Sequence, residues 1–311
     1  MAIKQSLAII YFLILICFYA LILRRKLIIV CDKYGRLANR LFLYAQLIEF
    51  AHQSNRELWA PGFHDYAKLF ETTKKKRFFT FSSKKDYTPN PFPALQSFYA
   101  FDKISKINEK LGNKRLLQNF HNYLSNDINP FKKMSTIPTS CILFKGFIFH
   151  QHFLDLKNSL PNIKKLFKPA SQFEKEINDP INRLRKKADV VIGVLIRQTD
   201  YRQWNEGKCF FTSIEYAQIL SRLKISFQGQ RLSFFIATDE EQNDMLFKSY
   251  DCIIRVGFPV QNLYSLAQCD LLIGPSSSYI AWSAAYSGIP LHTIQTAEDS
   301  PSKASFTLNY S

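Results

Sequence analysis

Short apolar runs alternate with helical repeats along most of the chain, and this alternation predicts the fold class. The clearest runs are residues 27–31, 189–196 and 232–237, which are typical of strands that are buried on both faces. Between such runs, apolar residues recur every three to four positions, as on one face of a helix. Strands that alternate with helices favour parallel, doubly wound sheets, so we expect an α/β protein.

The same alternation places further elements between residue 143 and the C-terminus. Strands are expected at 143–149, 252–256, 271–274 and 290–294. Helices are expected at 172–187 with an interruption at Pro180, and at 213–223, 240–248, 263–267 and 277–286. The segment 63–140 is rich in Lys, Phe, Asn and Pro, and within it 92–99 is expected to be a loop.

An apolar segment precedes the first strand. Residues 6–23 are apolar apart from Ser6 and two tyrosines, and about 20 such residues cross a bilayer as a helix. The basic residues 24–26 follow directly and provide no small-residue site for signal cleavage. Positive flanks tend to stay cytoplasmic, so we expect an uncleaved, single-pass membrane anchor with the globular part facing the cytosol. The alternative is a buried core helix.

Length and composition agree with two folded domains behind this anchor. The 311 residues are 47% hydrophobic and 21% charged, which excludes a disordered or collagen-like chain. Six cysteines without a C-x-x-C pair indicate neither a disulfide scaffold nor a zinc site, and buried free thiols are expected. We therefore predict an anchor at 1–26, a first α/β domain at 27–165 and a second at 166–311.

The charge balance favours an anionic partner. Lys and Arg number 41 against 25 Asp and Glu, which gives a net charge of +16. Nucleic acid, an anionic membrane surface and a phosphorylated small molecule all fit this excess. The chain carries no helix-turn-helix, zinc or RNP motif, so no nucleic-acid partner is expected. The basic run 74–77 is expected on the solvated surface, and His150 and His152 have poor spacing for a metal.

Polar loops follow four predicted strands, and ligands of open parallel sheets bind beyond the carboxyl ends of strands. The loop at 34–40 has Gly35 for a tight turn, and Arg36 and Asn39 could reach an anion or a sugar. The loop at 237–241 carries Asp239, which could accept hydrogen bonds from a base or a ribose. The structural alternatives are helix N-caps at Asn39 and Asp239.

The other two loops carry an arginine and a run of serines. Arg197 ends a fully apolar strand, where its charge needs either an anionic ligand or an internal pair with Asp200. Ser276, Ser277 and Ser278 precede a predicted helix, whose free N–H groups could bind an anion. A serine N-cap is the structural alternative.

Four motifs on these loops together resemble the fucosyltransferase superfamily, and most closely the α-1,2-fucosyltransferases of glycosyltransferase family eleven. They are GRLANRLFLYA, LIRQTDY, FFIATDE and SSYIAWSA, and the resemblance covers about residues 27–60 and 188–290. A softer match is FKGFIFHQHFLDLKNSL. The resemblance implies a GT-B-like architecture of two facing Rossmann-like domains with parallel sheets. It also implies inverting transfer of fucose from GDP-fucose to a glycan acceptor, without a metal or another cofactor.

The resemblance further implies roles for single residues. Arg197 would hold the β-phosphate of the donor and stabilise the departing GDP, and Asp239 would contact the guanosine. Ser277 and Ser278 would bind the phosphate oxygens. Arg36 and Asn39 would face the diphosphate and the sugar from the first domain.

Two positions depart from the family pattern. The family histidine two residues before the arginine is Leu195 here, and a second basic residue after it is Gln198. A non-catalytic or donor-altered relative is therefore the alternative function. A carboxylate usually accepts the proton of the acceptor hydroxyl, and Asp200 and Glu206 are the candidates nearest to Arg197, with Asp32 beside the first loop.

Overall fold

The computed structural model describes residues 2–74, 80–81, 94–112, 116–122, 130–148 and 162–308. By contacts the chain divides into two compact units, Met1–Lys168 and Pro169–Ser311, and the N-terminal apolar segment belongs to the first. Residues 75–77 of the basic run, His150, His152 and most of the softer sequence match lie outside the described residues.

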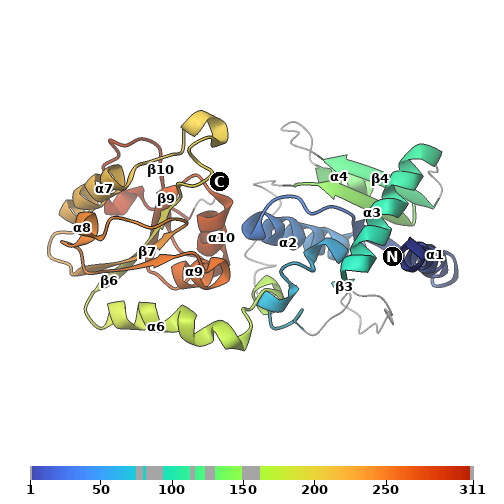
Figure 1. Ribbon diagram of the computed structural model, residues 1–311, viewed down its shortest axis with the longest axis horizontal. Helices are drawn as coiled ribbons and strands as arrows, with labels where there is room; N and C mark the ends of the chain where they lie inside the picture. Colours follow the sequence, from blue (N-terminus) through green and yellow to red (C-terminus); the bar gives the residue numbers. More distant parts are fainter. Residues whose placement is uncertain are drawn as a thin grey trace. The chain divides into compact units, whose positions relative to one another are not determined.

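The first unit is built around a five-stranded sheet (Figure 1). The strands lie in the order β3-β2-β1-β5-β4, and all pairs are parallel except that of the edge strand β3. The strands are β1 (Lys26–Val30), β2 (Arg56–Trp59), β3 (Thr80–Phe81), β4 (Leu117–Asn122) and β5 (Cys141–Gly146). The helical segments are α1 (Ala2–Cys17), η1 (Phe18–Ile22), α2 (Leu37–Gln53), η2 (Pro61–Phe63), η3 (Ala67–Leu69), α3 (Ala94–Leu111) and α4 (Pro130–Ser135).

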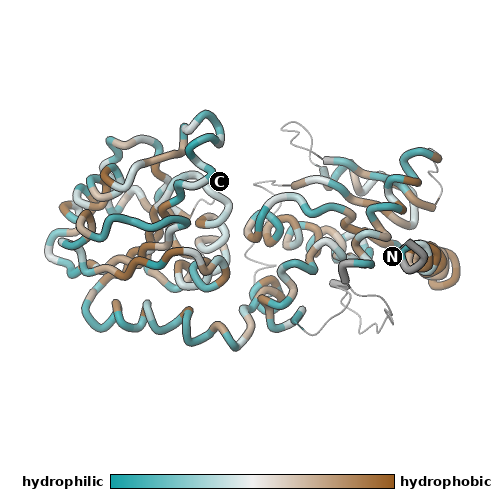
Figure 2. The backbone as a smooth tube through the Cα atoms, viewed as in Figure 1, coloured by the Kyte–Doolittle hydropathy of each residue, from teal (hydrophilic) through white to brown (hydrophobic). Residues whose placement is uncertain are grey.

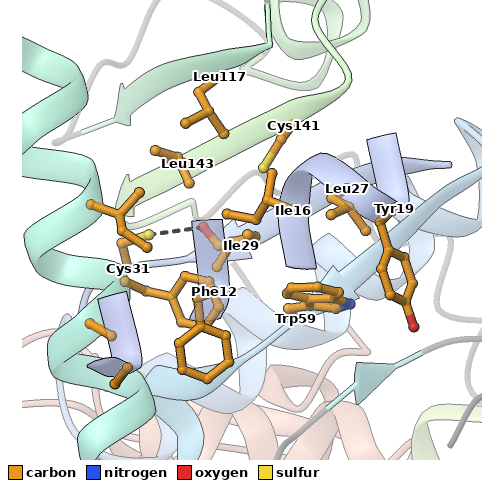
Figure 3. Close-up of a cluster of buried hydrophobic side chains, with 14 residues drawn as sticks. Phe12, Ile16, Tyr19, Leu27, Ile29, Cys31, Trp59, Leu117, Cys141 and Leu143 are labelled. Atoms are coloured by element: carbon orange, nitrogen blue, oxygen red, sulfur yellow. Dashed lines mark hydrogen bonds between the residues drawn. The ribbon is translucent and has the colours of Figure 1, made fainter. Parts of the chain in front are cut away.

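Helix α1 supplies part of the core of this unit. Every third or fourth side chain of the helix is buried, and these residues are Ala8, Phe12, Ile16 and, in η1, Tyr19. Figure 3 shows Phe12 and Ile16 among side chains of the sheet. The Phe12 ring lies 4.5 Å from that of Phe101 in α3, and the Tyr19 ring packs edge-on against Trp59. One stripe of α1 therefore covers the sheet as a core helix does.

The outer face of the same helix is apolar and exposed. Its exposed side chains are Leu7, Ile10, Ile14, Phe18, Leu21 and Ile22, and Figure 2 shows much of the segment in brown, the colour of hydrophobic residues. The stretch Gln5–Ile22 is long and apolar enough to cross a membrane, by length and composition. The described part of the chain thus has one candidate membrane helix, and this helix also belongs to the folded core.

Three expectations for the first unit differ from the structure. The expected loop at 92–99 is wrong from Ala94 onward, because α3 begins there and buries Ala100, Phe101 and Ile104 on one face. The helix after the first loop begins at Leu37, so its N-cap is Arg36 and not Asn39. The strand expected at 143–149 begins earlier and ends at Gly146, whose φ of 107° breaks the extended backbone.

The second unit holds a five-stranded, fully parallel sheet in the order β10-β9-β6-β7-β8. Its strands are β6 (Val190–Ile196), β7 (Leu232–Thr238), β8 (Cys252–Val256), β9 (Leu271–Pro275) and β10 (Leu291–Ile294). Its helices are η4 (Ser171–Phe173), α6 (Glu174–Arg185), η5 (Trp204–Gly207), α7 (Ser213–Ser226), α8 (Asp244–Phe247), α9 (Pro259–Leu266), α10 (Ser278–Ser287) and η6 (Lys303–Ser305). The expected α/β class with parallel sheets is confirmed.

Helices cover both faces of this sheet (Figure 1). Because side chains alternate along a strand, Ile192, Val194 and Ile196 of β6 pack with α7 and α8, whereas Val191 and Leu195 pack with α6, α9 and α10. The apolar runs that predicted buried strands are thus the central strands β6 and β7, which appear brown in Figure 2.

Three helices of the second unit differ from their predictions. The helix expected at 263–267 is α9, which begins four residues earlier, at Pro259. The expected helix at 240–248 is reduced to α8, because the Glu240 carbonyl accepts hydrogen bonds from the side chains of Thr238 and Gln242 in a turn, and Asn243 then caps the helix. Pro180 does not interrupt α6. The buried stripe of Ile177, Ile181 and Leu184 outweighs the roughly 3 kcal/mol that an interior proline costs.

The six cysteines are free thiols, and Cys31, Cys141 and Cys269 are fully buried. Burial raises the pKa of the Cys31 thiol well above its ordinary value, and the pKa of Cys141 and Cys269 is also raised by burial. These thiols therefore pack as small apolar side chains, as expected from the sequence.

Candidate functional site

Adjacent strands of the second unit end in register, and the candidate residues follow their carboxyl ends. Ile196 of β6 pairs with Thr238 of β7, and Thr238 pairs with Val256 of β8. Arg197 directly follows the last residue of β6, and Asp239 directly follows the last residue of β7. The pairing of strands thus brings together two side chains that are 42 residues apart in the chain.

Arg197 is the cation at this edge, and it makes the internal pair that the sequence left open. Its Nη2 donates to both carboxylate oxygens of Asp200 at 2.9 Å, and its Nε donates to Oδ1 at 3.1 Å. The side chain is only 16% exposed, and the guanidinium lies 5.2 Å from the centre of the Tyr201 ring. Burial opposes the charge of Arg197, but the hydrogen bonds and charge of Asp200 outweigh burial and raise its pKa. The guanidinium is therefore a fixed positive charge.

Asp239 organises the turn that carries Arg197. Its Oδ1 accepts a hydrogen bond from the Gln198 backbone N–H at 2.9 Å, and its Oδ2 accepts one from the Thr199 hydroxyl at 2.6 Å. The same Oδ2 lies 3.9 Å from Arg197 Nε. Asp239 is not the helix N-cap that the sequence left open, because α8 begins only after Asn243. Its observed partners give it a positioning role within this unit.

Tyr201 joins the arginine turn to the start of α10. Its hydroxyl donates to the Ser276 carbonyl at 2.8 Å, while its ring stacks on Trp204 at 5.1 Å. Ser277 is the N-cap of α10, and its hydroxyl accepts from the Tyr279 N–H at 3.2 Å. The serine N-cap alternative is thus confirmed for Ser277. The three serines, with Ser276 exposed, still lie at a helix N-terminus that Tyr201 joins to the half-buried Arg197.

Glu206 lies apart from these contacts. Its side chain is 82% exposed and pairs with Lys208 at 3.1 Å. It sits in a left-handed stretch formed by Asn205, Glu206 and Gly207. Asp200 and Asp239 contact the arginine turn, whereas Glu206 points to solvent and pairs with Lys208.

The two departures from the family pattern are both buried. Leu195 is packed in the apolar layer under α10, and a Cβ placed on Gly274 of β9 would lie 2.9 Å from the Leu195 Cβ. Gln198 donates to the Phe211 carbonyl at 2.8 Å and accepts from Gln242 Nε2 at 2.9 Å. Both side chains therefore hold the strand and its turn in place.

The first unit carries the other candidate loop between β1 and α2. Gly35 has a φ of 70°, and a Cβ at this position would lie 2.5 Å from Asn39 Nδ2. Only glycine fits this turn for both reasons. Arg36 is exposed at the N-cap position of α2, and Asn39 lies in the first helical turn. The turn thus places both candidate residues at one helix N-terminus.

Sequence reasoning missed the group that fixes this loop. Arg40 is buried and donates to the carbonyls of Lys33 at 3.1 Å, Gly35 at 3.3 Å and Gly62 at 2.9 Å. It also pairs with Asp65 at 3.1 Å. The second arginine in GRLANR could have indicated this role, because a buried arginine needs several acceptors.

Asp32 and Asp65 complete the setting of this loop. The Asp32 carboxylate accepts from the backbone N–H groups of Lys33 at 2.6 Å and Gly146 at 3.2 Å, so it ties β1 to β5. Burial acts to raise the pKa of Asp65, but hydrogen bonds from Lys33 and Arg40 lower it overall. Both carboxylates are thus engaged with the chain around the loop.

The second unit offers an arrangement suited to a diphosphate. A fixed guanidinium, the N-terminus of a ten-residue helix and hydroxyl groups lie together at one sheet edge. Each of these stabilises negative charge on an oxyanion. Among the described residues, no three His, Cys, Asp or Glu side chains gather as metal ligands. The Asp200 carboxylate lies at the same edge, on the Arg197 guanidinium.

Solved structures with similar folds include fucosyltransferases. A mutant of Arabidopsis thaliana FUT1 in complex with GDP is 14% identical, with a TM-score of 0.56 over 88% of this chain and 72% of that one. NodZ α-1,6-fucosyltransferase co-crystallised with GDP is 12% identical, with a TM-score of 0.53 over 86% and 94%. The structure of NodZ from Bradyrhizobium is also 12% identical, with a TM-score of 0.53 over 91% and 98%.

No model of a known protein family matches the sequence, and no curated protein matches it either. At 12–14% identity the structural similarity establishes the fold alone. The chain has the fold of two-domain GT-B-like glycosyltransferases, with two α/β units built on parallel sheets.

Proposed function

We propose that this protein is a glycosyltransferase that moves fucose from GDP-fucose to a hydroxyl of a glycan acceptor, with inversion and without a metal. The observation that carries the proposal is the half-buried Arg197, which lies over Tyr201, whose hydroxyl bonds to Ser276 at the N-terminus of α10. Departure of GDP leaves negative charge on the diphosphate, and a fixed guanidinium and helix N–H groups stabilise such charge. The similar solved structures that contain GDP or GDP-fucose support this choice of donor.

Donor binding requires an exchange of partners at Arg197. In the structure Asp200 occupies the fork of the guanidinium with both carboxylate oxygens. A diphosphate presents the same paired oxygens and more charge, so it competes for the same N–H groups. The exchange would release the Asp200 carboxylate beside the leaving group, where it can accept the proton of the acceptor hydroxyl.

Turnover of the donor tests the proposed function. Purified protein is incubated with GDP-fucose and a panel of glycans, while GDP release and product mass are followed. We expect GDP release that depends on acceptor and continues in the presence of EDTA. The absence of GDP binding and of donor turnover in the wild-type protein would contradict the proposal.

Asp200 and Glu206 are expected to differ as proton acceptors. In Asp200→Asn we expect kcat to fall by about 10²–10⁴-fold, because the amide cannot accept the proton. GDP affinity should stay equal or rise, since the amide competes less for Arg197. Glu206→Gln should change kcat by no more than about twofold, as for most exposed sites.

The pH profile separates a proton acceptor from a residue that only positions Arg197. The acidic limb of the kcat profile should be absent in Asp200→Asn and present in Glu206→Gln. A large loss in Glu206→Gln together with normal turnover in Asp200→Asn would instead assign the base to Glu206.

The alternative function is a non-catalytic or donor-altered relative, and the buried Leu195 motivates it. The side chain lies in an apolar layer, so it offers no hydrogen bond where relatives have a histidine. GDP binding without turnover over a broad acceptor panel would support this alternative.

We further propose that the protein attaches to a membrane through the exposed face of α1. The residues on this face are aliphatic or aromatic, and the exposed basic residues Arg24 and Lys26 follow it. The buried stripe of the same helix favours a helix that stays on the first unit over one that crosses the bilayer. Orientation toward the cytosol remains a prediction from the basic flank.

A further inference from the structure

Phe258 is an exposed aromatic residue in a backbone conformation that favours glycine. It lies between β8 and α9 with a φ of 50° and a ψ of 63°, and its side chain is 54% exposed. Left-handed backbone costs a residue with a Cβ roughly 1–2 kcal/mol, and exposing a phenylalanine forgoes the gain from burying it. No aromatic ring of a described residue stacks on the Phe258 ring, so ring stacking within the protein does not offset either cost.

The segment around Phe258 is held firmly. The Gly257 N–H donates to the Thr238 carbonyl at 3.0 Å, and the Asn262 N–H donates to the Phe258 carbonyl at 2.9 Å. Asn262 Nδ2 donates to the carbonyls of Arg255 at 3.1 Å and Gly257 at 2.5 Å. The Tyr279 hydroxyl of α10 donates to the Pro259 carbonyl. The ring is therefore presented by a fixed backbone.

The register of the sheet places this segment in line with the candidate diphosphate site. Val256, Thr238 and Ile196 are paired across β8, β7 and β6, and all three strands end there. Neighbouring strands are about 4.8 Å apart, so the backbone after β8 lies about 10 Å along the edge from Arg197. A nucleoside diphosphate with its phosphates at Arg197 would extend its base over such a distance.

Trp204 is the competing aromatic residue at this edge, with half of its side chain exposed. Its ring already stacks on Tyr201, and Tyr201 lies under the Arg197 guanidinium. Trp204 is thus at the phosphate end of the edge and has a ring partner. Phe258 lies at the far end, where a base would reach.

We propose that Phe258 is the platform on which the base of the nucleoside diphosphate stacks. This inference rests on the proposed function, because it assumes a nucleotide donor with its phosphates at Arg197. Stacking on an aromatic ring is tolerant of base identity, so Phe258 supplies affinity, and other groups must select guanine. The left-handed backbone and the exposed ring are then costs that nucleotide binding offsets.

Calorimetric titration with GDP and with inorganic pyrophosphate tests the platform. Phe258→Ala should weaken GDP binding by about 10-fold to 100-fold, the range for loss of one base stack. Pyrophosphate binding should be unchanged, because pyrophosphate has no base. Phe258→Trp should retain GDP affinity, and GDP should quench the fluorescence of the new indole.

Two further variants control for folding and location. Phe258→Gly removes both ring and strain, so it should raise the melting temperature while it lowers GDP affinity. Met245→Ala removes another exposed side chain of the same unit and should leave GDP affinity unchanged.

The outcomes separate the platform from the proposed function. Equal GDP affinity in the wild-type protein and Phe258→Ala would overturn the platform and leave the proposed function standing. A loss of GDP affinity in Trp204→Ala but not in Phe258→Ala would have the same meaning. Binding of another nucleoside diphosphate in preference to GDP, lost in Phe258→Ala, would support the platform and contradict the GDP-fucose donor. No nucleotide binding by the wild-type protein would overturn both.

Discussion

Replacement of Arg197 by alanine is expected to lower donor turnover by about 10²–10³-fold. The variant loses the guanidinium that faces the diphosphate, and it leaves two carboxylates at the site. Asp200 loses its 2.9 Å partner, and Asp239 Oδ2 loses a cation at 3.9 Å. The site thus changes from attracting an anion to repelling one, so GDP affinity should fall together with kcat.

A neighbouring arginine provides the matched control. Arg202 pairs with Glu240 at the surface and has half of its side chain exposed. Arg202→Ala removes the same charge from the same loop, yet it should change GDP affinity and turnover by no more than about twofold, as for most surface pairs. Titration of GDP into both variants and measurement of GDP release provide the comparison.

Arg197→Lys separates charge from geometry. Lysine keeps the positive charge but lacks the planar fork, so it should recover part of the affinity and less of the turnover. Wild-type GDP affinity in Arg197→Ala would show that the arginine serves only to hold Asp200, and the proposed site would be wrong.

Replacement of Phe12 by alanine is expected to lower the free energy of unfolding by about 3–5 kcal/mol. The Phe12 side chain is fully buried and packs against Phe101 of α3 (Figure 3). Its removal leaves a cavity between α1 and the sheet. Since domains are stable by only about 5–15 kcal/mol, the first unit should be close to unfolding in this variant.

Ile14 on the same helix provides the control, because its side chain is 64% exposed. Ile14→Ala should change the free energy of unfolding by no more than about 0.5 kcal/mol. Urea unfolding in a mild non-ionic detergent, followed by circular dichroism, measures both variants. Equal stability of the two variants would show that α1 leaves the core and crosses the bilayer.

The sequence predicted the second unit well because its signals are local. The buried strands are continuous apolar runs, and β8 has the predicted bounds, Cys252–Val256. Helix α10 starts at a serine cap and ends at Gly288 in the left-handed conformation. Each of these elements depends on residues that are neighbours in the chain, so a pattern of a few residues suffices to find them.

The same local signals misjudged elements that tertiary contacts decide. The residues before Asp244 form a turn, because Gln242 bonds to the Glu240 carbonyl and to Gln198, which is 44 residues away. The start of helix α3 was predicted to be a loop because of the proline and aromatic residues there. In the structure Phe101 of α3 packs against Phe12 of α1, which is far away in the sequence. Contacts between residues so far apart in the sequence do not show in the local hydrophobic periodicity, so a local pattern cannot predict them.

The sequence by itself determined the α/β class, the parallel strands and the loops that carry Arg197, Asp239 and Ser277, because hydrophobic periodicity and capping chemistry are encoded within each segment. Only the tertiary structure decided the partners of those side chains. Arg197 is paired with Asp200, Asp239 holds the turn, and Glu206 faces solvent. The structure likewise decided that one stripe of α1 is core and the other is exposed, because burial depends on which surfaces the folded chain brings together.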